Sequence, residues 1–370
     1  MKQTSKDQRV FETIKRDLTE EDLFRKLRQE IQSIREFYLD AEQQVKLKKM
    51  NRLRRFFYII WWVLKGMFFK LNPLRRILLL IAFLVPFTSV SHEIGNETKF
   101  IINNELITTI LILFVLMLEL KDKLLAHEEL NAARKVQLAL QPDPQPEVNG
   151  WDIFLFTKPA NNVGGDLIDF MKIGDNPLYG ITIADIAGKG LKSALLAAKL
   201  QTLIHISVNG DDNLNEKIFR LNQFFYKETL RSLFATLIFV QIRPDDSKIQ
   251  FVNAGHLPPM IIKKNSEGLS ELIETQKGDG AIGLMERNNF TLNEIELATN
   301  EIFIAYSDGL LEARNEFNQF FGIERLKKIL MKYSHLDSKS LCSRILISLE
   351  KFMGDAKQND DISIVIIRKI

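Results

Sequence analysis

The chain has 370 residues, which is enough for two or three structural units, and a formal net charge of only +3. Charged residues make up 26% and hydrophobic residues 46%, a globular balance that excludes a largely disordered chain. The small net charge indicates no particular partner, and we expect no nucleic acid to be bound. The single cysteine, Cys342, excludes an internal disulfide and any metal site built from several cysteines.

Residues 1–54 predict a helical segment on the cytoplasmic side of a membrane. Apolar residues recur at helical spacing between residues 5 and 50, and the polar N-terminus carries no cleavable signal. Lysines and arginines crowd residues 46–55, directly before an aromatic-rich run at 56–69. A basic collar beside aromatic residues is typical of a membrane interface, so we predict that 56–69 is interfacial and does not span the bilayer.

Residues 55–120 as a whole predict a membrane region. Two nearly unbroken apolar runs occupy 77–90 and 106–118, with polar sequence between them. Each run is shorter than the roughly 20 residues that span a bilayer, which leaves buried core helices as an alternative. The basic flanks favour insertion, because they lie at the outer ends of the two runs, at Arg75, Arg76, Lys121 and Lys123.

The positive-inside rule then predicts two transmembrane helices, at about 74–93 and 101–120. The protein would be a multi-pass protein of the inner (cytoplasmic) membrane, with its N-terminus and its C-terminal domain in the cytoplasm. A linker helix and a proline-rich connection follow at 121–149. Periodicity does not decide whether this helix transmits a signal or is a passive spacer.

The remaining residues, 150–370, predict one soluble domain. Its strands cluster and do not alternate strictly with helices, which favours an α+β layered fold over a Rossmann-type fold. The predicted strands are 151–156, 167–173, 178–184, 235–242, 249–252, 259–262, 302–306 and 362–367. The predicted helices are 191–206, 214–230, 323–333 and 338–352.

Four short acidic motifs in this domain each place an aspartate at the edge of an apolar segment. Carboxylate oxygens suit Mg²⁺ and Mn²⁺, and two such ions can activate one water for attack on phosphorus. A single aspartate at a strand end is more often a turn former or a helix cap, so the prediction depends on all four motifs together. The motifs are Val163–Asp166, Ile183–Gly190, Tyr306–Gly309 and Asp360–Ile362.

Taken in order, these motifs resemble the SpoIIE/RsbU branch of the metal-dependent (type 2C) protein phosphatases. Further segments that carry the likeness are Ala133–Pro142, Phe234–Leu237, Asn253–Pro259, Leu310–Asn315 and Phe320–Gly322. The resemblance covers about residues 130–370. It implies an α+β sandwich of two antiparallel sheets flanked by helices, here preceded by the membrane hairpin and the linker helix.

The resemblance also implies a site for two Mn²⁺ or Mg²⁺ ions. Asp185 would bridge both ions, with the Ile186 carbonyl as a further ligand. Asp361 would either be a ligand in the same site or contact the ligands without binding metal itself. The other expected ligands, which with Asp185 are the expected catalytic residues, are Asp166, Asp308 and Asp360.

Such a site would hydrolyse phosphoserine or phosphothreonine on a protein, with a metal-bridging water as nucleophile. In proteins of this kind the usual substrate is a phosphorylated anti-sigma-factor antagonist, and the N-terminal region acts through the linker helix. A homodimer formed through the linker helices is left open. We expect Lys189 to be solvated, although a contact with phosphate is the alternative, and His256 to be structural.

Three other functions compete with this one. Gly164–Asp166 followed by Phe170 is superficially similar to the diguanylate cyclase signature, but Leu167 and Ile168 replace its acidic-aromatic pair. A catalytically weak receptor that uses a phosphatase fold only to bind a partner is disfavoured, because all four ligand positions are retained. A purely structural membrane anchor would leave the aspartates without a purpose.

Overall fold

The computed structural model describes residues 38–48, 50–87, 91–94, 98–101, 104–175, 177–210, 212–229, 233–265 and 270–370. The chain divides into two compact units, Met1–Leu124 and Leu125–Ile370. Most of the N-terminal helix that we predicted between residues 5 and 50 lies outside the described residues. Its end is helical, as α3 (Ala41–Lys48).

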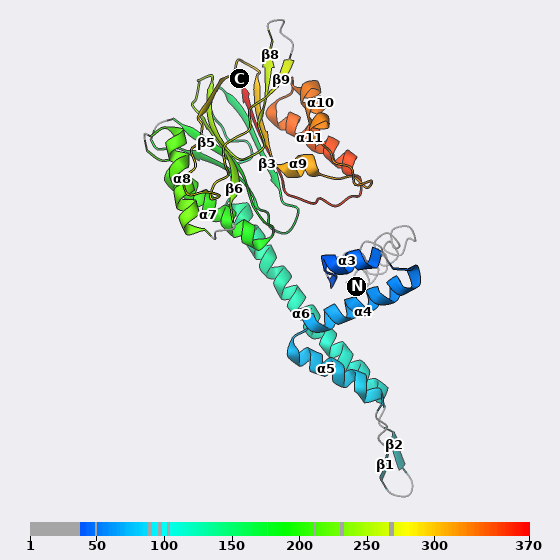
Figure 1. The fold of residues 1–370 in the computed structure, drawn as a ribbon. Coiled ribbons are helices and arrows are strands. Elements are labelled where there is room, and N and C mark those ends of the chain that lie inside the picture. Colours follow the sequence, from blue (N-terminus) through cyan, green and yellow to red (C-terminus); the bar gives the residue numbers. More distant parts are fainter. Residues whose placement is uncertain are drawn as a thin grey trace, which may run out of the picture. The chain divides into compact units, whose positions relative to one another are not determined.

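The first unit is built mainly from helices (Figure 1). After α3 come α4 (Arg52–Lys70), α5 (Pro73–Leu84), the 3₁₀ helix η1 (Val85–Phe87) and the strand pair β1 (Ser91–Ile94) and β2 (Thr98–Ile101). The long helix α6 (Asn104–Ala139) starts in this unit and contributes its last residues to the second one. The run that we predicted to be interfacial, 56–69, falls inside α4.

The predicted pair of transmembrane helices, at about 74–93 and 101–120, is wrong, and with it the multi-pass location in the inner membrane. Across the described ranges, none of the helices is both long enough and apolar enough to cross a bilayer. Helix α5 has only 12 residues, against the roughly 20 that a span requires.

The charged residues around α6 explain why the flanks misled the prediction. Acidic and basic side chains, Glu105, Glu119 and Asp122 among them, bound the apolar run of this helix on both sides. Arg75, which we interpreted as a membrane flank, donates to Glu119 at 2.7 Å and to Asp122 at 2.5 Å. Its charge therefore joins α5 to α6 by ion pairs.

The second unit contains two five-stranded antiparallel sheets. The first sheet has the order β10-β7-β6-β5-β4 and the second β3-β12-β11-β8-β9. The first comprises β4 (Asp166–Lys172), β5 (Tyr179–Ile186), β6 (Ala235–Ile242), β7 (Lys248–Ala254) and β10 (Asn293–Glu296). The second comprises β3 (Trp151–Lys158), β8 (Met260–Lys264), β9 (Ser270–Glu274), β11 (Ile302–Tyr306) and β12 (Ile362–Lys369).

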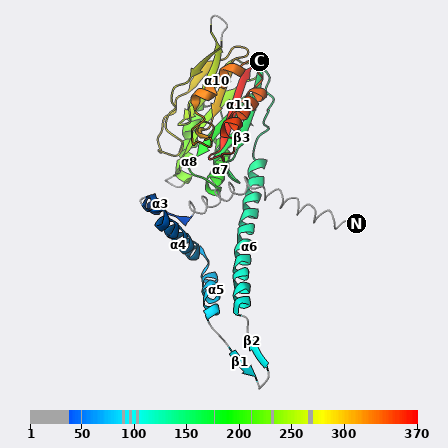
Figure 2. The same cartoon turned by 90° about the vertical axis from the view of Figure 1, so that its right-hand side faces the viewer.

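Helices cover the outer face of each sheet, which gives four layers (Figures 1 and 2). Helices α7 (Leu191–Ser207) and α8 (Leu214–Glu228) pack on the first sheet around residues such as Leu200 and Phe225. Helices α9 (Asp308–Glu312), α10 (Ile323–Tyr333) and α11 (Ser338–Met353) pack on the second. A third apolar cluster, which includes Ile183 and Phe303, lies between the sheets. Burial of apolar surface in these three clusters is the main force that holds the layers together.

The predicted α+β sandwich of two antiparallel sheets is confirmed for this unit. All eight predicted strands and all four predicted helices of the domain are present. The strands that we missed, β9 and β10, contain no fully buried residue, and each packs one partly buried apolar side chain, Leu272 or Ile295, against the core. One such position per strand is too few to show the alternation that identifies a strand in the sequence.

Candidate active site

Two of the predicted ligands meet at one edge of the first sheet. Asp166 is the first residue of β4, and Asp185 lies one residue before the end of β5. The two strands are antiparallel, and their register places Asp166 directly opposite Asp185. The sequence therefore folds so that two carboxylates separated by 19 positions share one sheet edge.

The other two motifs meet in the same way at the edge of the second sheet. Asp308 begins α9 directly after β11, and Asp360 stands just before β12, the strand that pairs with β11. The Ser363 amide donates to Ser307 Oγ at 2.9 Å, which joins the two loops. They pass so closely that a Cβ on Gly309 would lie 1.9 Å from the Asp361 carbonyl oxygen, so only glycine fits there.

The aspartates of the two edges are within electrostatic reach of one another. Burial, together with the charges of Asp308, Asp360 and Asp361, raises the pKa of Asp185 to about 7. Burial likewise raises the pKa of Asp166 well above its usual value and, together with the charge of Asp360, raises that of Asp308. In the protein without metal, this edge therefore holds protons that isolated carboxylates would release.

The edge has further features that suit a cation. Asp166 Oδ2 is buried and has no hydrogen-bond partner among the described residues. The Ile186 carbonyl oxygen faces the same turn, because a Cβ on Gly165 would lie 3.3 Å from it. Among the residues that the structure describes, however, no group of three or more His, Cys, Asp or Glu side chains is gathered closely enough to hold a metal ion.

The Asp361 carboxylate accepts hydrogen bonds from backbone amides in and near the Val163–Asp166 turn. Its Oδ2 accepts hydrogen bonds from the amides of Gly165 at 2.6 Å and Asp166 at 3.3 Å, and its Oδ1 accepts one from Ala160 at 2.7 Å. A Cβ on Gly164 would lie 2.5 Å from Oδ2, so the turn needs glycine to approach this carboxylate. Asp361 thus fixes the turn that positions Asp166.

Lys189 is not merely solvated, contrary to our expectation. Its ammonium donates to Asp360 Oδ2 at 2.7 Å and to the Asn359 carbonyl oxygen at 3.1 Å. His256, for which we expected a structural role, lies inside the fold. It is buried, its Nδ1 lies 2.9 Å from Thr236 Oγ1, and burial lowers its pKa to about 4, so the ring is neutral.

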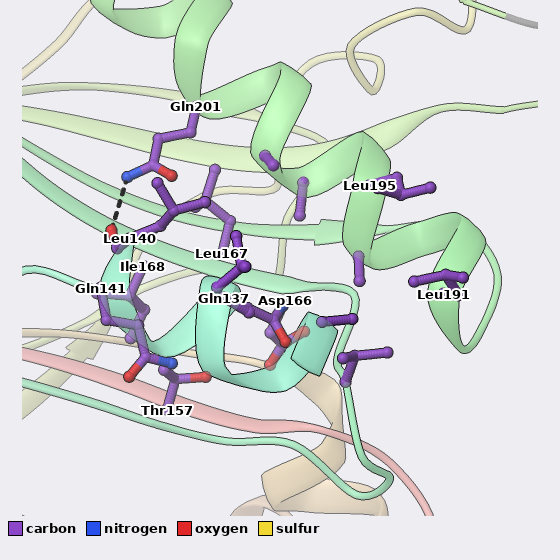
Figure 3. Close-up of a pocket in the computed structure, with 16 residues that line it drawn as sticks. Gln137, Leu140, Gln141, Thr157, Asp166, Leu167, Ile168, Leu191, Leu195 and Gln201 are labelled. Atoms are coloured by element: carbon purple, nitrogen blue, oxygen red, sulfur yellow. Dashed lines mark hydrogen bonds between the residues drawn. The ribbon is translucent and has the colours of Figure 1, made fainter. Parts of the chain in front are cut away.

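The last turns of α6 contact the turn that carries Asp166. Gln137 Nε2 donates to the Gly164 carbonyl oxygen at 2.8 Å, and its Oε1 accepts from the Gly164 amide at 3.1 Å. Beside this pair lies a cavity of about 230 Å³, lined mainly by apolar side chains of α6, β4 and α7 (Figure 3). At its other end Gln201 donates to the Leu140 carbonyl oxygen at 3.0 Å.

Sequence reasoning missed the polar contacts of this helix. Gln137 lies in a segment that carries the family resemblance, but one glutamine on an amphipathic helix looks like any solvated residue. Asp169 was missed as well; it is buried and held by Gln201 at 2.9 Å and His205 at 2.6 Å. An acid inside a predicted strand is the one signal that pointed to it.

The raised pKa of Asp185 predicts how pH changes the stability of the metal-free protein. The folded state keeps this proton up to about pH 7, whereas the unfolded chain releases it near 3.8, so this stabilisation is lost as pH rises between those values. Asp185→Asn removes the effect. We expect the Tm of the variant, relative to wild type, to rise when metal-free samples are moved from about pH 5 to about pH 8. A Tm difference independent of pH would contradict it.

Comparison with known proteins agrees with this geometry. The family model described as stage II sporulation protein E (SpoIIE) matches residues 175–369. Protein IcfG of Synechocystis sp. is 28% identical over 229 residues, which cover 55% of this chain and 35% of IcfG. Phosphoserine phosphatase RsbU of Bacillus subtilis is 24% identical over 241 residues, which cover 65% of this chain and 70% of RsbU.

A solved structure supports the fold. The SiaA-PP2C domain of Pseudomonas aeruginosa superimposes with a TM-score of 0.57 at 21% identity, over 67% of this chain and 99% of that domain. The chain thus spans about a third of IcfG but nearly the whole of this domain. Because the family model matches more than half of its residues, the chain belongs to the SpoIIE family, the SpoIIE/RsbU-type branch of the metal-dependent (type 2C) protein phosphatases.

Proposed function

We propose that the chain is a metal-dependent protein phosphatase that hydrolyses phosphoserine or phosphothreonine on a protein substrate. The observation that carries this proposal is the meeting of four aspartates at adjacent edges of two packed sheets, where burial and neighbouring carboxylates raise the pKa values of Asp166, Asp185 and Asp308. Perturbed carboxylates gathered in this way are typical of functional sites. They also provide the oxygen donors that Mg²⁺ and Mn²⁺ prefer.

The residues that would hold two Mn²⁺ or Mg²⁺ ions are assigned as follows. Asp185 is the central ligand, because its carboxylate is coupled to those of both loops of the second sheet. The buried, unpartnered Oδ2 of Asp166 and the Ile186 carbonyl oxygen add donors from the first sheet. The second sheet adds Asp308 and Asp360. When bound, such ions supply an activated water and neutralise charge on the phosphoryl group.

Asp361 has a different role in this proposal. Its two oxygens already accept hydrogen bonds from three backbone amides. We assign it to holding the turn before Asp166, and Asp360 to direct contact with metal. The side chains of the turn then need no reorganisation to present Asp166, which favours catalysis.

The substrate that we propose is a phosphorylated anti-sigma-factor antagonist. The support is the family membership and the similarity to RsbU, which is named a phosphoserine phosphatase. A second copy of the chain is the other partner that we propose, bound through the linker helices. Leu125 and Val136, apolar side chains of α6 that are exposed in the single chain, lie on one face of the helix and favour such a contact.

Replacing one central carboxylate tests the proposed activity. Asp185→Asn keeps the size of the side chain but removes the carboxylate that interacts with both aspartate loops of the second sheet. We expect hydrolysis of p-nitrophenyl phosphate, measured with Mn²⁺, to fall about a thousandfold or more, because nucleophile activation and charge stabilisation fail together. Chelation of the metal is expected to have the same effect on wild type. Equal rates for variant and wild type would refute the assignment, and formation of a cyclic dinucleotide would favour a cyclase.

Gln137 tests whether the end of α6 positions the catalytic turn. Gln137→Leu keeps the packing but removes both hydrogen bonds to Gly164. We expect kcat for p-nitrophenyl phosphate to fall about tenfold with little change in KM, because small displacements of a reacting group are costly. Gln141→Leu, in the same cavity wall, is the matched control and is expected to behave like wild type. Equal loss in both variants would indicate a general packing effect.

A further inference from the structure

We propose that Lys189 is an exchangeable counter-ion of Asp360. Its ammonium neutralises this carboxylate in the metal-free protein, leaves it when a divalent cation binds there, and then binds the phosphate oxygens of the substrate. The inference rests on the proposed function, because it assigns a further residue to the same site.

The ion pair links the two sheet edges. Lys189 follows β5 of the first sheet, and Asp360 precedes β12 of the second, yet Nζ and Oδ2 are 2.7 Å apart. Among the ion pairs in the described part of the chain, this one alone includes any of the four proposed ligands, namely Asp360. A single lysine therefore supplies the nearby positive charge to a strongly acidic edge.

The loop is built to carry a side chain that moves. Gly188 and Gly190 flank the lysine with φ angles of 121° and 78°, which L-residues with side chains rarely adopt. A Cβ on either glycine would meet nothing within 4 Å, so there is open space beside both neighbours of the lysine. The Lys189 side chain is 61% exposed and that of Asp360 41% exposed, so water can replace each partner.

Charge repulsion explains why the lysine has to leave Asp360 when a divalent cation binds there. A divalent cation on Asp360 would stand within a few ångströms of the ammonium, and two like charges so close repel each other. The lysine stem is long and flexible, so Nζ can leave Oδ2 and still remain beside the acidic edge. A phosphate ester that reaches the edge then offers oxygens for a charge-assisted hydrogen bond.

The variant Lys189→Met tests the exchange, because it keeps an unbranched stem that is only one atom shorter and removes the charge. With chelated, metal-free full-length protein at low ionic strength, calorimetric titration with Mn²⁺ alone is expected to give about two- to fivefold tighter binding than wild type, the range for loss of an exposed ion-pair competitor. With Mn²⁺ saturating, KM for p-nitrophenyl phosphate is expected to rise about tenfold, because a charged hydrogen bond to phosphate is lost.

Two further variants separate charge from shape. Lys189→Arg keeps a cation on the loop and is expected to restore both values to near those of wild type. Lys192→Met removes an exposed lysine from the first turn of α7, three positions away, and is expected to change neither. A merely structural lysine would not raise Mn²⁺ affinity on removal.

Unchanged or weaker Mn²⁺ binding by Lys189→Met overturns the proposal, because the lysine would then support Asp360 and not compete with metal. An unchanged KM overturns it as well, because the released ammonium would then not reach phosphate. Failure of the proposed function has a different signature. Wild type would then release no phosphate with Mn²⁺, whereas the binding titration would still report on the counter-ion.

Discussion

The Asp361 carboxylate joins the two sheets at the point where the site is built. It precedes β12 in the second sheet and accepts hydrogen bonds from Asp166, which begins β4 in the first, and from Gly165 directly before that strand. Hydrogen bonds to a buried charged group are among the stronger polar interactions in proteins. Because this contact fixes the turn before Asp166, the register between β4 and β5 can place Asp185 opposite it. The close passage of Gly309 over the Asp361 carbonyl then brings in the Asp308 loop.

The arrangement concentrates negative charge where burial already disfavours it. The raised pKa values of Asp166, Asp185 and Asp308 express that conflict, and a pure stability criterion would not select such an edge. The energy stored there is available to a cation, whose binding removes both the repulsion and the desolvation penalty of the carboxylates. In the metal-free protein, the Lys189 ammonium neutralises part of this negative charge through its ion pair with Asp360. Under the proposed function, this edge of the sandwich lowers the stability of the metal-free protein and raises its affinity for metal.

Much of the catalytic unit was predictable from sequence, because its strands are buried and its acidic motifs lie at strand ends. Ile302–Tyr306 is apolar throughout, and it forms β11 with the predicted bounds. The separate roles of Asp360 and Asp361 were not predictable. The sequence does not show which of these two adjacent carboxylates lies beside the backbone amides of the distant turn before Asp166. The prediction of a membrane hairpin was wrong for a related reason. In the sequence, Arg75 resembles a basic residue that flanks a membrane span, whereas in the structure it forms ion pairs with Glu119 and Asp122 of α6. Local patterns show which residues are apolar or charged, whereas the partner of a charge is set by the tertiary fold.

Location of bound manganese in a crystal of the full-length protein would test the central claim most directly. Diffraction data collected at the manganese absorption edge identify the ion independently of the refined coordinates. The account predicts anomalous peaks within coordination distance of Asp185, with Asp360 among the ligands and Asp361 still bound to the backbone amides of the Gly165–Asp166 turn. Peaks at Asp361 in place of Asp360, or no peak at the aspartate edge at saturating Mn²⁺, would contradict it.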